Sequence, residues 1–147
     1  MNPSDLAELR TMYVFTPIGG ETWGLTFDSF RAHLLAGDPE AFLQVDEGHT
    51  GPVRNVGLQF GVTLGEEELE GFALLSPEGV AVKNCTAQEA ANFVIWLRDQ
   101  VVPQNEIVTF NTEWGIEEDA PDEPVPDVTR PRLVAAFLAH LETLGLD

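Results

Sequence analysis

The sequence predicts an α+β fold: an antiparallel β-sheet of meander and hairpin strands with two to three α-helices packed on one face, a two-layer sandwich. Three observations predict it. Apolar residues alternate with Gly, Gln and Thr between Val56 and Leu64, which is the period of a strand with one buried face. The segments 86–101 and 129–145 carry apolar residues at helical spacing. Turn residues separate the short apolar runs between them.

The first elements form a short helix and a hairpin. Ser4 precedes a helix expected over 5–9, and the apolar run 13–15 reads as a strand. The turn residues of 17–20 predict that 21–24 returns as the hairpin partner of that strand.

A second helix follows Thr26, whose side chain is a good N-cap. Its apolar face begins at Phe27 and includes Phe30 and Leu34, and Gly37 is a natural C-terminal stop. A short strand is expected over 41–45, before a loop at 48–54.

The central strands then form a meander. The alternating strand 56–64 is followed by a strand at 72–75, a turn at 76–79 and a third strand at 80–83. Strands this close in sequence pair antiparallel.

Two capped helices complete the fold. Thr86 and Glu89 have capping-box spacing and open a helix that runs to about Val101, before Pro103. A β-branched strand follows at 107–111. Thr129 then caps the last helix, with Pro131 in its first turn and Gly145 at its end. The apolar stripes of these two helices contain Ala90, Phe93, Val94, Leu97 and Val101, and Val134, Phe137, Leu138, Leu141 and Leu144.

Length and composition indicate one domain, residues 1–147, that carries a long, acidic, proline-containing loop at about 112–128. With 44% hydrophobic residues among 147, the chain can bury a core without metal or disulfide support. The lone Cys85 forms no internal disulfide and is expected to be a small buried side chain. With no secretory signal or membrane-spanning run, we expect a cytoplasmic protein. The bias to Arg over Lys, with many Ala, Gly and Val, suggests a GC-rich genome and a bacterial source.

The net charge of -18 restricts the partners. Nucleic acids and anionic membranes require clustered Lys and Arg, whereas this chain has only seven, and they are scattered. We therefore expect no direct nucleic-acid or membrane binding. A basic protein is the electrostatically favoured partner.

The acid residues gather in two places. The stretch 113–127 holds no basic residue, and it combines its carboxylates with Trp114, an aromatic of the kind that anchors interfaces. A second group, on a predicted strand–strand loop, either is a solvated tip that discourages edge pairing or joins the first as one negative face. The expected partner-binding residues are Glu113, Trp114, Glu117, Glu118, Asp119, Asp122 and Glu123, with Glu66, Glu67, Glu68 and Glu70 as the second patch.

No pattern in the sequence specifies a reaction. The three His residues have no ligand-spaced neighbours, the acidic stretch lacks the order of a calcium loop, and neither a nucleophile elbow nor a phosphate-binding glycine loop is present. We therefore expect no metal, no cofactor and no enzymatic activity.

The sequence is best interpreted as a small acidic binding protein, an inhibitor or immunity-type protein for a basic partner such as a toxin nuclease. One alternative is an oligomeric accessory or chaperone-like protein whose subunits meet at Ile95 and Trp96, which lie beside the apolar face of their helix and would form the oligomer seam. If these two residues form no such contact, their helix is instead buried on two sides. The other is an enzyme with an unrecognised site. The sequence allows a monomer or a homodimer.

Overall fold

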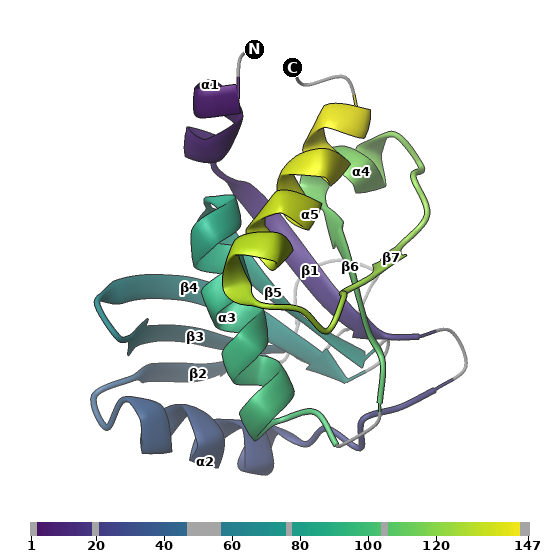
Figure 1. Cartoon of the computed structure of the whole chain (residues 1–147). Coiled ribbons are helices and arrows are strands. Elements are labelled where there is room, and N and C mark those ends of the chain that lie inside the picture. Colours follow the sequence, from purple (N-terminus) through teal and green to yellow (C-terminus); the bar gives the residue numbers. More distant parts are fainter. Residues whose placement is uncertain (1–2, 19–20, 47–56, 76–77, 104–105, 145–147) are drawn as a thin grey trace.

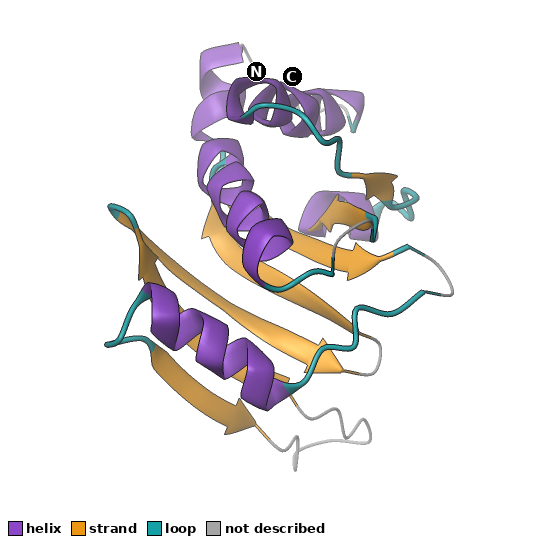
Figure 2. Ribbon diagram, turned by 60° about the horizontal axis from the view of Figure 1, so that its bottom comes forward, coloured by secondary structure: helices purple, strands orange, loops and turns teal. Residues whose placement is uncertain are grey.

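The computed structural model describes residues 3–18, 21–46, 57–75, 78–103 and 106–144. It contains a seven-stranded antiparallel sheet with the strand order β2-β3-β4-β5-β1-β6-β7. Helices α2, α3 and α5 lie on one face of that sheet, which curves around them (Figure 1, Figure 2). The predicted α+β class is confirmed.

Strands β3 (Gly57–Leu64), β4 (Glu67–Leu75) and β5 (Glu78–Cys85) form the predicted meander. The last two are longer than their predicted runs, because pairing begins at Glu67 in β4 and extends β5 at both ends. The edge strand β2 (Phe42–Asp46) pairs with β3, close to the predicted position. The loop expected at 48–54 lies outside the described residues, as does part of the turn at 76–79.

The predicted hairpin after β1 (Thr11–Pro17) is wrong. No strand forms over 21–24, and β1 instead pairs with β5 on one side and with β6 (Val108–Thr112) on the other. The Glu78 carboxylate accepts the backbone N–H groups of Trp23 at 2.6 Å and Leu25 at 2.8 Å. A side chain from a distant strand thus satisfies the amides that a hairpin would have paired.

The two helices with the clearest caps form as predicted. In α2 (Phe27–Gly37), the Thr26 hydroxyl accepts the N–H of Ser29; in α3 (Ala87–Gln100), Thr86 and Glu89 complete a capping box. The first helix, α1 (Pro3–Glu8), begins one residue before Ser4, so Ser4 is not its cap.

The C-terminal helix α5 (Arg130–Thr143) packs against α3 and has proline in its first turn. Thr129 stands at its N-cap position but forms no side-chain cap bond, and Gly145 lies outside the described residues. Aromatic rings from both helices and the sheet meet in the core, where Phe93 stacks between Phe15 and Phe60 while Phe137 packs against Phe110. The core therefore lies between the helices and the sheet.

Candidate functional site

The stretch predicted as one long loop, residues 113–127, contains regular structure, and we call it the acidic segment. It opens as helix α4 (Glu113–Glu117) and returns along β6 as the short strand β7 (Glu123–Pro124). Figure 1 shows it running along one side of the molecule before the chain enters α5. All seven of its acid residues are exposed: Glu113, Glu117, Glu118, Asp119, Asp122, Glu123 and Asp127.

Helix α4 forms because Thr112 caps it. The Thr112 hydroxyl accepts the N–H of Gly115 at 3.1 Å, and Gly115 is buried against β6. A Cβ on Gly115 would lie 1.9 Å from the side-chain oxygen of Asn111, so only glycine allows this approach. The same packing leaves Trp114 40% exposed and Ile116 49% exposed.

Asn111 attaches the middle of the segment to the sheet. Its side-chain amide donates to the carbonyl of Ala120 at 3.0 Å and to the carboxylate of Asp122 at 3.1 Å. Its carbonyl oxygen accepts the N–H of Thr112 at 2.9 Å. Because Asn111 is buried, losing these bonds would leave unsatisfied polar groups inside the protein.

His140 attaches the segment to α5. Its Nδ1 contacts the Glu123 carboxylate, and its Nε2 lies 3.0 Å from the Thr112 hydroxyl. A hydroxyl, an imidazole and a carboxylate in this order resemble a nucleophile with its base and orienting acid. Thr112, however, is 0% exposed and already accepts the N–H of Gly115, so its oxygen has no approach for a substrate. The trio acts as an internal brace.

Arg98 holds the end of the segment. Its guanidinium donates to the carbonyls of Val125 at 2.9 Å and Pro126 at 3.2 Å, and the N–H of Val125 donates to the carbonyl of Val108 at 2.8 Å. Together with Asn111 and His140, Arg98 fixes the segment along its whole length. The segment is thus organised before any partner arrives, which lowers the ordering cost of binding.

The second acidic group, Glu66–Glu70, which we call the hairpin tip, was predicted to be a strand–strand loop, and that prediction is wrong for most of it. Only Gly65 and Glu66 connect β3 to β4, because β4 begins at Glu67 and its backbone pairs with β3 from that residue onward. Glu66, Glu68 and Glu70 are exposed. Glu67 is partly buried. One of its carboxylate oxygens accepts a hydrogen bond from the side-chain amide of Asn92, and the other is buried without a hydrogen-bond partner.

The structure does not join the hairpin tip to the acidic segment as one negative face. Strands β5 and β1 lie between β4 and β6 in the sheet. Arg10 lines one pocket with Glu66 and a second pocket with Lys83 and Glu113. Cations therefore interrupt the negative charge between the two groups.

Ile95 and Trp96, the alternative oligomer seam, pack largely inward. Both side chains are partly buried against the core, and the Trp96 ring lies 6.1 Å from the ring of Phe30 and 5.6 Å from that of Phe93. Helix α3 is thus covered by the sheet, by α5 and, at Trp96, by Phe30 of α2.

Three residues of the site were missed from the sequence: Arg98, Asn111 and His140. His140 carried a detectable signal, because it lies in phase with the buried stripe of α5 at Leu133, Phe137 and Leu141. A histidine on a buried stripe requires polar partners. Nothing local indicated that those partners were Thr112 and Glu123.

Cys85 is buried, and its thiol lies 3.3 Å from the carbonyl of Lys83. Burial raises the pKa of the thiol to about 12, and the nearby Glu89 carboxylate adds to that effect. It is therefore a poor nucleophile at neutral pH.

Across the described ranges, no three His, Cys, Asp or Glu side chains converge to hold a metal ion. None of the described helices combines the length and hydrophobicity needed to cross a bilayer. Comparisons with protein-family models, curated proteins and solved structures found no match to this chain.

Proposed function

We propose that this protein binds a basic protein through the acidic segment, as an inhibitor or immunity-type protein. One observation carries the proposal: two large apolar side chains, Trp114 and Ile116, stand exposed among carboxylates on a segment that is fixed from beneath. Protein interfaces typically combine such an aromatic anchor with a polar rim.

Charge would mainly set the association rate of the complex, and apolar contact would mainly set its dissociation rate. The net charge of -18 steers a basic partner toward the protein and raises the association rate. The buried area of Trp114 and Ile116 then slows dissociation, since most differences in affinity between related complexes lie in the dissociation rate. A nuclease is a suitable target, because the surface that holds its nucleic acid is basic.

The test is an affinity capture from native lysate that compares wild type with three variants. Trp114→Ala removes the anchor, and Glu113→Gln/Glu117→Gln/Glu118→Gln removes three charges from the acidic segment. The matched control, Glu66→Gln/Glu68→Gln/Glu70→Gln, removes three charges from the hairpin tip.

We expect one basic protein to be held near stoichiometrically by wild type and by the control. Trp114→Ala should weaken that complex at least about tenfold, mainly through faster dissociation. The charge variant of the segment should mainly slow association. A diffuse set of basic proteins, or equal retention by all variants, would refute the proposal.

A further inference from the structure

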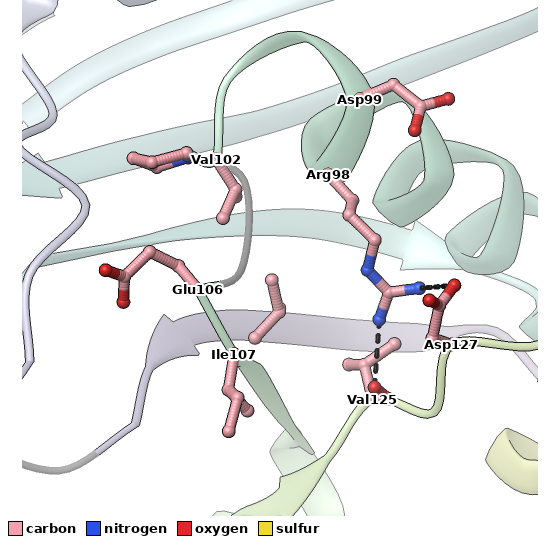
Figure 3. Close-up of a pocket in the computed structure, with 9 residues that line it drawn as sticks. Arg98, Asp99, Val102, Glu106, Ile107, Val125 and Asp127 are labelled. Carbon is pink, nitrogen blue, oxygen red and sulfur yellow. Dashed lines mark hydrogen bonds and ion pairs between the residues drawn. The ribbon is translucent and has the colours of Figure 1, made fainter.

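A pocket of about 650 Å³ opens at the far end of the acidic segment from α4 (Figure 3). The end of α3, the beginning of β6 and the residues after β7 form its walls. Val102, Ile107, Val108 and Val125 supply the apolar part of the lining. Ile107 is 47% exposed, whereas Val102, Val108 and Val125 are buried, so Ile107 is the apolar side chain of the lining that a partner can reach.

Carboxylates surround that apolar surface. Asp99, Glu106 and Asp127 line the pocket, and in Figure 3 Glu106 and Asp127 lie on opposite sides of the apolar side chains. The Asp127 side chain is 100% exposed. The rim can therefore meet a positive charge from more than one direction.

The one cation in the lining is directed into the protein itself. Arg98 donates to the carbonyls of Val125 and Pro126, lies 3.8 Å from Asp127 and keeps only 22% of its side chain exposed. Set against three acids, it leaves the pocket with a net negative charge.

We infer that this pocket receives a lysine or arginine side chain of the basic partner. Such a side chain has an aliphatic stem and a cationic end. The stem can pack against the exposed Ile107 side chain, and the charged end matches the carboxylate rim. A purely apolar side chain would leave the rim unused, and an anionic one would be repelled by it.

The inference rests on the proposed function and extends it. Val125 and Asp127 belong to the acidic segment, so the same segment contributes to the pocket at one end and carries Trp114 and Ile116 at the other. The partner would then be held at two points, with an apolar contact at α4 and a cationic side chain at the pocket.

The experiment uses small probes, so it requires no partner protein. Nα-acetyl-lysine methylamide and Nα-acetyl-arginine methylamide are titrated into the full chain, with Nα-acetyl-norleucine methylamide as the uncharged analogue. Methyl resonances of Val102, Ile107 and Val125 are followed by NMR. From the shifts of these methyls, we expect the cationic probes to bind at least about fivefold more tightly than the norleucine probe. Added salt should weaken the binding of the cationic probes only.

Two variants test where the charge is recognised. Glu106→Gln/Asp127→Asn removes two acids from the rim and should weaken the cationic probes about fivefold or more. The matched control, Glu117→Gln/Glu118→Gln, removes two exposed acids from α4 and its C-terminal end and should leave binding within about twofold.

Equal affinity for lysine and norleucine probes, or equal losses in the two variants, would overturn the inference. Such a failure would leave the Trp114 surface untouched. Conversely, probe binding at the pocket combined with no effect of Trp114→Ala on partner capture would retain the pocket and refute the proposed function. The two failures are therefore distinguishable.

Discussion

The acidic segment and the hairpin tip have similar charge and different construction. The segment is held from within by Asn111, His140 and Arg98, and it presents Trp114 and one side of a carboxylate-rimmed pocket to solvent. The hairpin tip consists of a tight turn and the first residues of β4, and Glu67, its one inward acid, contacts Asn92 within the protein. Two regions of similar negative charge thus differ in internal bracing and in exposed apolar area. Those two differences, rather than the charge, are the grounds on which we propose the acidic segment as the binding surface.

His140→Ala should produce the largest difference between the two regions. It removes a buried ring and leaves the Thr112 hydroxyl without one of its partners, at a cost of about 3 kcal/mol. Urea unfolding measures the loss. Hydrogen exchange should show the amides of Gly115 and Val125 opening faster, while those of β3 and β4 change only with global stability.

Glu68→Ala at the hairpin tip is the control for this variant. It should change the stability by no more than about 0.5 kcal/mol, because the side chain is exposed. Similar losses in the two variants would mean that His140 does not brace the segment.

Two glycine substitutions, one in each region, should cause intermediate losses of stability. Gly115→Ala places a Cβ against the Asn111 side chain and should cost about 2 kcal/mol while displacing α4. Gly65→Ala meets open space beside the hairpin tip, but its φ of +67° disfavours a side chain, so it should cost about 1 kcal/mol.

Chemical denaturation of both variants, together with the indole N–H resonance of Trp114 in NMR spectra, separates the two effects. Only Gly115→Ala should change the environment of Trp114 in the folded state. A shift of that resonance in Gly65→Ala, or none in Gly115→Ala, would contradict the proposed packing of α4.

Cys85 gives an effect on stability that is confined to alkaline pH. The folded protein keeps the thiol protonated up to a pKa of about 12, whereas the unfolded chain loses that proton near the ordinary value of 9.0. The folded state thus binds more protons in this window, so the contribution to stability is complete below pH 9 and is lost as pH rises toward 12. Cys85→Val should flatten this part of the stability profile, and burial of Tyr13, which raises its pKa too, accounts for some of the remaining slope.

The same thiol reports on the hairpin tip, because the Glu67 carboxylate contributes to its raised pKa. Glu67→Gln should lower that pKa slightly, and Glu117→Gln in the acidic segment should leave it unchanged. Thiolate absorbance across an alkaline titration measures both. A larger shift from Glu117→Gln would show that the two regions are electrostatically coupled.

Local patterns were sufficient to predict most of the elements. The alternation of Leu58, Phe60 and Val62 and the capping residues Thr26 and Thr86 each act within a few neighbours, so their signals survive in the sequence alone. The carboxylates of the acidic segment and Trp114 were visible for the same reason.

The long-range polar contacts were not predictable in this way. Glu78 takes the amides of Trp23 and Leu25, and His140 joins Thr112 to Glu123, with no periodic signal between the partners. These contacts replaced the predicted hairpin and anchored the predicted loop. The prediction therefore failed at places where a distant side chain forms the hydrogen bonds that a neighbouring strand or helix would otherwise form.

The position of β1 in the sheet has a consequence for how the chain reaches its structure during synthesis. The strands of the meander neighbour one another in sequence and can pair as soon as they leave the ribosome. Strand β1 is made before them, yet both of its partners lie in later parts of the chain. The N-terminal strand must therefore wait for β5 as its first partner and for β6 as its second. The rings of Tyr13 and Phe15 remain uncovered longer, until α3 and α5 supply Phe93 and Phe137. This delay is when the nascent chain is most exposed to misassembly.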